Sequence, residues 1–147
     1  MERLLRNMGA QVNPYLMSED ARAQAKFYIE SLGGEILSVM THEQMGAQHE
    51  FKDKVMHLSL VVAGGNSLLM ADSFEPFTQG RGISLSVTYE TDSEANEAFT
   101  KLAVGGNVKY PLELQPWGML YGELSDQYGV SWMITAQPST GNPNQTN

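Results

Sequence analysis

The sequence predicts an α+β protein built from two βαβββ modules, and three observations lead to this fold class. A helix-like segment occurs twice, 72 residues apart (92 − 20). Each copy lies between apolar, strand-like runs and is followed by a strand, a glycine-containing turn and another strand. An acidic and aromatic linker, Ser73–Gly82, separates the two halves. Two curved mixed sheets, each with its helix on the outer face, account for this pattern.

The two predicted helices are found by aligning Asp20–Ile36 with Asp92–Val108. The matched pairs are Asp20 with Asp92, Ala23 with Ala95, Phe27 with Phe99, and Gly33-Gly34 with Gly105-Gly106. Each copy starts with an acidic or hydroxyl N-cap and stops at a glycine pair, which are common helix boundaries. The repeat therefore predicts one helix in each module.

Four strands are expected in each module. Those of the first are Val12–Met17, Glu35–Thr41, Val55–Val62 and Ser67–Ala71, and those of the second are Ile83–Thr88, Asn107–Leu114, Met119–Leu124 and Val130–Thr135. Gly64-Gly65 and Tyr128-Gly129 supply the turns that close each module. The modules thus span residues 11–72 and 83–136 of a single domain, 1–136, and the polar stretch 137–147 is expected to be a disordered tail.

Composition excludes several classes of function. Nine Lys and Arg against 17 Asp and Glu give a net charge of −8, with no basic stripe for a nucleic acid. The absence of cysteine excludes disulfides, thiolate metal sites and cysteine nucleophiles. The N-terminal residues lack the apolar core of a signal peptide or membrane span, so the cytoplasm is the expected location.

Alternation along the strands predicts which side chains face the helices. The helix side should receive Ile83, Leu85 and Val87 from one strand, and Met56, Leu58 and Leu60 from another. The inner face should receive Ser84 and Ser86, together with His57 and Ser59. An inner face this polar is typical of a small-molecule cavity.

Several short motifs make the chain resemble the vicinal oxygen chelate superfamily, which includes glyoxalase I, extradiol dioxygenases and bleomycin and fosfomycin resistance proteins. The motifs are NPYL at Asn13–Leu16, FYIESLGGEI at Phe27–Ile36, DKVMHLSL at Asp53–Leu60, QPWG at Gln115–Gly118 and DQYGVSWMI at Asp126–Ile134. They are most similar to the PhnB-like branch, which often carries methyltransferase-like names. The resemblance implies a glyoxalase/bleomycin-resistance-like fold and a homodimer.

The metal site that the resemblance implies is not matched by suitable residues. Superfamily enzymes usually hold a divalent ion with His and Glu side chains on the inner faces. Here the corresponding positions fall near Asn13, near Gly82, within Ser67–Leu69 and on Met133. None is a carboxylate or imidazole, so no cofactor is predicted, and a divalent metal held by an unusual set of ligands is left as the alternative. No glycine-rich nucleotide loop follows a strand, which weakens the methyltransferase label.

Two candidates for acid/base chemistry remain, each with a structural alternative. His57 matches a histidine of PhnB-like sequences and would hydrogen-bond a ligand or act as a base, or it is a histidine satisfied by a backbone carbonyl. Glu123 would pair with His57 if it faced it, and is otherwise a solvated strand residue. A three-histidine metal site with His42 and His49 is disfavoured by the irregular spacing.

The predicted ligand-binding residues lie on the inner faces or at their mouth. They are Asn13, Tyr15, Ser59, Ser84, Ser86, Trp117, Tyr121 and Met133. Trp132 should point outward at a helix because Met133 points inward.

Two hypotheses of function follow from these residues. In the first, the protein binds a small molecule in the cavity of its sheets without the usual metal. In the second, it is a lyase, isomerase or dioxygenase-like enzyme that acts on a small polar metabolite with His57 as acid/base.

Overall fold

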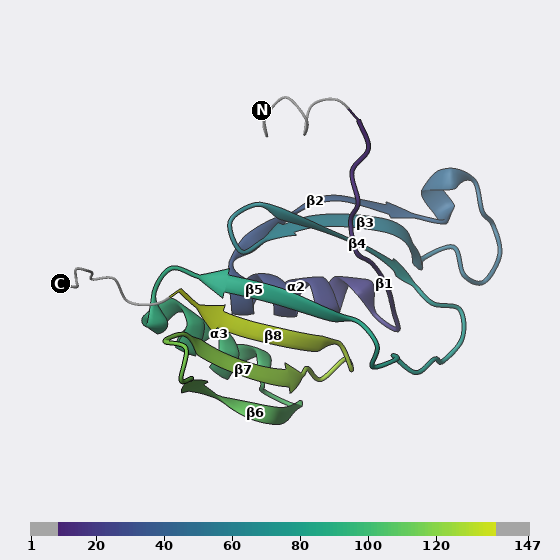
Figure 1. Ribbon diagram of the computed structural model, residues 1–147. Coiled ribbons are helices and arrows are strands. Elements are labelled where there is room, and N and C mark those ends of the chain that lie inside the picture. The colour runs from purple at the N-terminus through teal and green to yellow at the C-terminus, as the bar shows by residue number, and fades with distance from the viewer. Residues whose placement is uncertain (1–8, 138–147) are drawn as a thin grey trace.

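The computed structural model describes residues 9–137 and confirms the predicted repeat (Figure 1). The first module contains β1 (Tyr15–Ser18), α2 (Ala21–Leu32), β2 (Gly34–Thr41), the short 3-10 helix η1 (Glu43–Met45), β3 (Val55–Val62) and β4 (Asn66–Asp72). The second contains β5 (Ser84–Tyr89), α3 (Asp92–Leu102), β6 (Asn107–Leu114), β7 (Leu120–Ser125) and β8 (Ser131–Ala136). Each module is therefore a βαβββ unit.

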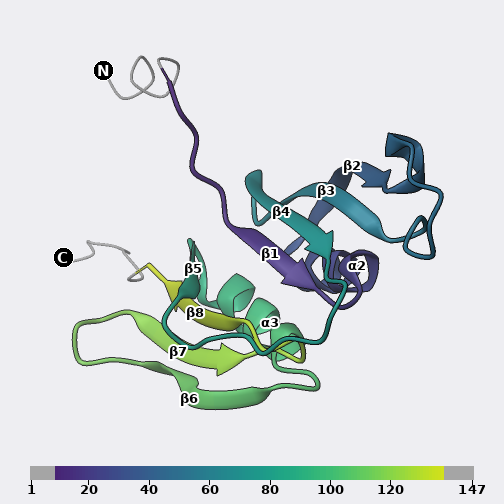
Figure 2. The same ribbon diagram turned by 90° about the vertical axis from the view of Figure 1, so that its right-hand side faces the viewer.

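Both modules form a four-stranded mixed sheet with the same topology. The strand orders are β1-β4-β3-β2 and β5-β8-β7-β6. The first strand of each module runs parallel to the last, and the other pairs are antiparallel. Helices α2 and α3 pack on their own sheets and contact each other. Figure 2 shows the modules beside one another, with β1 as the strand of the first sheet nearest to the second module.

The helix boundaries follow from their caps. The Asp20 side chain accepts a hydrogen bond from the Ala23 amide at 3.1 Å, and α2 ends at Gly33 with a positive φ of 80°. Thr91 caps α3 by accepting from the Glu94 amide at 3.1 Å, so the N-cap lies one residue before Asp92. Helix α3 ends at Ala103, before the glycine pair.

The predicted alternation holds along β3 from Leu58 and along β5 from Ser84, with two corrections. Met56 was expected on the helix side, but it is only half-buried and Val55 is buried instead, where the β2–β3 register shifts between Met40 and Thr41. Leu58 and Leu60 are fully buried, and Leu85 and Val87 are half-buried members of the same core. The prediction that Ile83 faces the helix is also wrong, because its side chain is 81% exposed. The strand ladder begins only at Ser84, so Ile83 projects from the linker without a cross-strand neighbour.

A buried polar network joins the helix sides of the two modules. Trp132 is buried, as predicted, but it packs edge-on against Tyr28 of the other module's helix, with ring centroids 5.2 Å apart. Asp126 is also buried, and its carboxylate accepts from the Tyr28 hydroxyl at 2.6 Å and the Trp132 indole at 2.9 Å. Gln24 donates to the Tyr28 oxygen at 2.8 Å. This network fixes the modules relative to each other.

The predicted tail and the expected absence of a membrane span are compared with the described part of the chain. All of the predicted tail except Gln137 lies outside the described residues, and so do residues 1–8 of the predicted domain. Between residues 9 and 137, neither helix has the length and apolar character that crossing a membrane requires.

Candidate functional site

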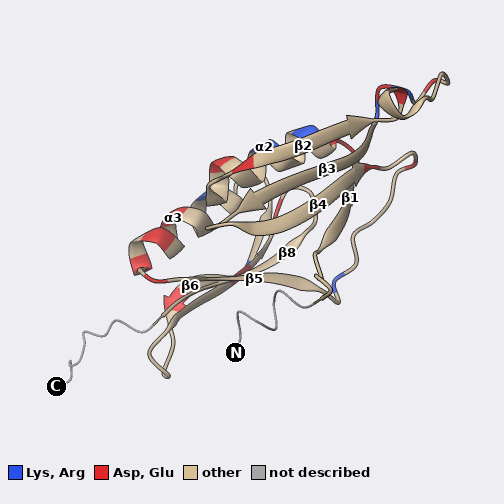
Figure 3. Cartoon of the chain, turned by 90° about the horizontal axis from the view of Figure 1, so that it is seen from above, with Lys and Arg blue, Asp and Glu red and all other residues tan. Residues whose placement is uncertain are grey.

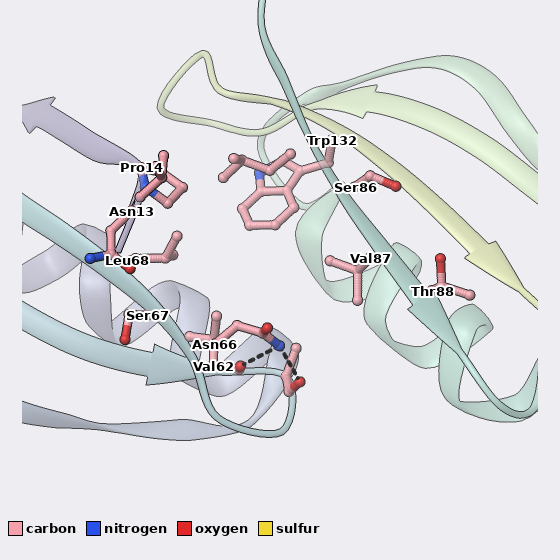
Figure 4. A pocket seen from close by; sticks show the side chains of 13 residues that line it. Asn13, Pro14, Val62, Asn66, Ser67, Leu68, Ser86, Val87, Thr88 and Trp132 are labelled. Carbon is pink, nitrogen blue, oxygen red and sulfur yellow. Dashed lines mark hydrogen bonds between the residues drawn. The ribbon is translucent and has the colours of Figure 1, made fainter. Parts of the chain in front are cut away.

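A cavity of about 490 Å³ lies at the seam between the two modules (Figure 4). Its walls come from the segment before β1, the β3–β4 hairpin, strand β5 and one residue of β8. The lining residues are Val12, Asn13, Pro14, Val62, Ala63, Asn66, Ser67, Leu68, Leu85, Ser86, Val87, Thr88 and Trp132. Its volume falls in the range of about 300–1,000 Å³ that is typical of ligand pockets.

The cavity has an apolar floor and an uncharged polar rim. Val62, Leu68 and Trp132 are buried and form the floor, where Figure 4 shows the indole between the two modules. The rim consists of amide and hydroxyl side chains, namely Asn13, Asn66, Ser67, Ser86 and Thr88. Such a cavity can pack the apolar part of a ligand against its floor and hydrogen-bond a polar group of the same ligand at its rim.

Part of the rim is held in place by the protein itself. The Asn66 amide donates to the carbonyl oxygen of Ala63 at 2.8 Å, which fixes the tip of the β3–β4 hairpin. The Thr88 hydroxyl accepts from Thr135 at 2.9 Å. Within residues 9–137, the side chains of Asn13, Ser67 and Ser86 make no hydrogen bond to protein. These three groups are therefore available to a ligand.

A second hollow of about 450 Å³ continues the seam on the other side of Pro14 and Leu85, which line both spaces. It is lined further by Tyr15, Leu16, Gln79, Gly80, Gly82, Ile83, Val130 and Ser131. Within residues 9–137, neither hollow has an Asp, Glu, His, Lys or Arg among its lining residues. The whole seam is thus uncharged in a protein of net charge −8.

His57 lies on the inner face of the first sheet, outside both hollows. It is half-buried on β3, on the side opposite the buried Leu58. The Tyr15 hydroxyl is 3.2 Å from His57 Nδ1, and the two rings are tilted at 5.8 Å. His57 therefore has a phenol as its partner, not a backbone carbonyl, and Tyr15 connects it to the second hollow.

Glu123 has its partners in its own sheet. Its carboxylate accepts a hydrogen bond from the Tyr121 hydroxyl and lies 3.9 Å from the Lys109 ammonium. Burial of the phenol and the adjacent carboxylate raise the pKa of Tyr121 to about 12. The structure does not bring Glu123 and His57 together as the predicted acid/base pair. Each residue instead hydrogen-bonds a tyrosine of its own module.

The other predicted ligand residues fall into two groups. Asn13 and Ser86 line the cavity. Ser59, Ser84, Tyr121, Met133 and Trp117 line neither hollow. Met133 lies in the ladder between Ser86 and Glu123, and Trp117 is 63% exposed in the β6–β7 loop.

Several cavity residues were not predicted. Thr88 continues the alternation of Ser84 and Ser86, so strand parity alone was sufficient to find it. Ser67 and Asn66 lie at the start of β4, at the place where the superfamily's ligand position was sought, and they contribute polar groups of a different kind. The floor residues gave no signal, because buried apolar residues of a core and of a pocket look alike in a sequence.

The donor chemistry does not fit a divalent metal centre at the superfamily's positions. Asn13 offers an amide, Met133 a thioether and Ser67 a hydroxyl, whereas such ions require carboxylates or imidazoles. Among the residues that the structure describes, no group of three or more His, Cys, Asp or Glu side chains could hold a metal ion.

Comparison with known proteins gives the family. The family model described as 3-demethylubiquinone-9 3-methyltransferase matches residues 10–135. The structure of PA1353 from Pseudomonas aeruginosa is 30% identical, with a TM-score of 0.79, and the match covers 89% of this chain and 100% of that one. A PhnB protein from Bacillus cereus, titled a putative 3-demethylubiquinone-9 3-methyltransferase, is 31% identical with a TM-score of 0.73, over 87% and 100%.

More distant matches agree with this assignment. Protein YjdN of Escherichia coli K12 is 24% identical over 136 residues, which is 84% of this chain and 92% of that protein. A glyoxylase/bleomycin resistance protein/dioxygenase domain from Frankia shares the fold, with a TM-score of 0.64 at 16% identity over 96% and 100%. The chain therefore belongs to the PhnB-like, 3-demethylubiquinone-9 3-methyltransferase-like family and has the glyoxalase/bleomycin resistance/dioxygenase fold.

Proposed function

We propose that the protein binds a small organic molecule in the seam cavity, without a metal ion or another cofactor. The observation that carries this proposal is the lining itself: a buried apolar floor beneath a rim of three unbonded polar side chains. The floor supplies hydrophobic burial, and the rim supplies orientation through hydrogen bonds. Neither contribution requires a metal.

The methyltransferase name of the family implies a methyl-donor cofactor with a charged amino-acid end and a ribose. A site for such a group normally offers a carboxylate to the ribose hydroxyls and charged partners to the amino acid. In the described part of the chain, neither hollow provides a charged side chain, so the lining residues do not fit this cofactor.

A neutral fluorescent probe, N-phenyl-1-naphthylamine, tests the binding proposal. We expect its emission to rise on addition of the protein, and chelation with EDTA to leave the affinity unchanged. Ser86→Phe should abolish binding, because the phenyl ring fills the rim of the cavity. Ser84→Phe is the matched control, since Ser84 is exposed on the same face of β5 but lines neither hollow. Equal binding to both variants would refute a site in this cavity.

One observation favours an enzymatic alternative. The hydrogen bond between Tyr15 and His57 connects an imidazole to a phenol that lines the second hollow. In this alternative, the Tyr15 hydroxyl is the group that meets the substrate, and His57 takes up or returns its proton from the inner face. Of this pair, Tyr15 lines the second hollow and His57 does not.

The two proposals make opposite predictions for His57. If the protein is only a binder, His57→Ala leaves the affinity for the probe unchanged. If it is an enzyme, turnover of a small polar substrate falls by about 10²–10⁴-fold in both His57→Ala and Tyr15→Phe. Turnover that survives both substitutions would exclude the alternative.

A homodimer is also proposed, on the exposed apolar side chains of the inner faces. Met40 lies opposite His57 on β2 and is 40% exposed, and Met17 on β1 of the same sheet is 43% exposed. Tyr110 on the other sheet is 52% exposed. A second copy would cover these side chains. Light scattering after size-exclusion chromatography should give twice the 16.2 kDa mass of the chain. Met40→Lys should shift the mass to that of a monomer.

A further inference from the structure

The charges of the protein are segregated from the seam. Asp and Glu gather on the helices and loops, and the strands that flank the seam are almost free of charged residues (Figure 3). Among residues 9–137, no Lys or Arg lines either hollow. An anion that entered the cavity would therefore lose water without gaining a cationic partner.

A buried carboxylate that bonds a floor residue makes the site less suitable still for an anion. Asp126 lies behind Trp132, and its oxygen accepts from the indole nitrogen at 2.9 Å. This carboxylate also accepts from the amides of Tyr128 and Val130, at 2.7 and 3.1 Å. It is buried, so solvent screens its negative charge only weakly. The Trp132 part of the cavity floor is thus hydrogen-bonded to a buried carboxylate.

The described side chains of the rim offer no charged partner to an anionic ligand. Asn13, Ser67 and Ser86 present one amide and two hydroxyls, which can donate or accept. These groups suit the carbonyl, hydroxyl or ether oxygens of an uncharged molecule. An isolated carboxylate, phosphonate or sulfonate requires guanidinium or ammonium groups, or a set of converging amides, which the rim lacks.

Resting on the proposed binding function, we infer that the ligand of the seam cavity is an uncharged organic molecule and that organic anions are excluded. The apolar body lies on Val62, Leu68 and Trp132, and a neutral oxygen or nitrogen at one end meets the rim. The exclusion arises because no cation lies among the described lining residues and because the buried Asp126 carboxylate bonds the floor residue Trp132.

A matched pair of probes tests the exclusion. N-phenyl-1-naphthylamine is neutral, and 8-anilino-1-naphthalenesulfonate has the same rings with one added sulfonate. We expect the neutral probe to bind at least about tenfold more tightly, a difference of about 1.4 kcal/mol. The titrations are made in 1 M NaCl, where the Debye length is about 3 Å, so that repulsion from the distant surface charges is screened.

A charge-gain variant makes the test specific to the cavity. Ser86→Arg places a guanidinium on the rim and should raise the affinity for the sulfonate probe by about tenfold or more. Ser84→Arg adds the same charge to the same strand face outside the lining and should change it by less than about twofold.

The outcomes separate this inference from the proposed function. If the wild-type protein binds both probes equally, and Ser86→Phe abolishes both, the cavity is a binding site but the inference is overturned. If neither probe binds, or if binding is insensitive to Ser86→Phe, the proposed function itself is overturned. A preference for the neutral probe that Ser86→Arg reverses and Ser84→Arg leaves intact supports the inference.

Discussion

The interface between the two modules has a closed side and an open side. On the helix side, Tyr28 and Trp132 converge on the buried Asp126, whose two oxygens accept four hydrogen bonds. On the strand side, β1 and β5 flank two adjoining hollows in place of a packed contact. The comparison teaches that the modules are oriented from one side only, which leaves the other side free for a ligand.

Trp132 belongs to both sides. Its indole nitrogen is held by Asp126, and its ring forms part of the cavity floor. Trp132 is therefore the side chain that links the polar network to the cavity. Substitutions on the closed side and on the open side should have very different effects on stability.

The largest expected effect follows from removing the centre of the closed side. Asp126→Ala leaves the Tyr28 hydroxyl, the Trp132 indole and two amides without their acceptor in a buried environment. We expect the free energy of unfolding to fall by about 3–5 kcal/mol, measured by urea denaturation. Asp20→Ala, which removes an exposed N-cap, is the control and should cost about 1 kcal/mol. Similar losses for the two variants would contradict a central role of Asp126.

A pair of identical truncations compares core and cavity floor. Leu58 is fully buried in the core, whereas Leu68 is buried at the floor of the seam cavity. Leu58→Ala should cost about 3–5 kcal/mol, and Leu68→Ala about 2 kcal/mol, because the floor leucine already has open space on one side. Chemical denaturation of both variants checks the difference. A larger cost at Leu68 would mean that the cavity is filled or closed in solution.

Tyr28→Phe should have a smaller effect, with a distinct dependence on pH. Burial and the neighbouring Asp126 carboxylate raise the pKa of Tyr28 far above its ordinary value of 10.0. Above pH 10 the unfolded chain therefore releases a proton that the folded protein retains, and stability falls by about 1.4 kcal/mol per pH unit for this group.

The variant isolates this contribution. At neutral pH, Tyr28→Phe should lose about 1–2 kcal/mol for the missing hydrogen bond. Between pH 10 and 11 the free energy of unfolding of the variant should decline less steeply than that of the wild-type protein. The difference in slope is the contribution of the single Tyr28 phenol. Parallel curves of unfolding free energy against pH would show that the phenol ionises equally in both states.

The smallest effect on stability is expected on the open side. Ser86 is exposed on the cavity rim and makes no hydrogen bond to protein within the described range, so Ser86→Phe should change the free energy of unfolding by less than about 0.5 kcal/mol. Thermal denaturation checks this value. A loss above about 2 kcal/mol would indicate that the rim is packed, and would make the variant unsuitable as a test of ligand binding.

Local patterns in the sequence were sufficient for the fold but not for the site. The repeat around Phe27 and Phe99 and the alternation along β3 and β5 come from neighbouring residues, whose spacing determines helix and strand faces. The cavity depends on how two modules approach each other, and Leu68 and Trp132 look like ordinary core residues until that approach is known. His57 was correctly placed on an inner face, but its partner Tyr15 lies 42 residues away.

The central claim, that the seam cavity lined by the β3–β4 hairpin and β5 is the binding site, is tested most directly by nuclear magnetic resonance. Isotope-labelled protein is titrated with N-phenyl-1-naphthylamine, and amide shifts are followed residue by residue. The account predicts the largest changes at Asn13, Ser67, Leu68, Ser86 and the Trp132 indole, with little change at Glu123 and Tyr121. Shifts concentrated at His57 and Glu123, with the seam unaffected, would contradict it.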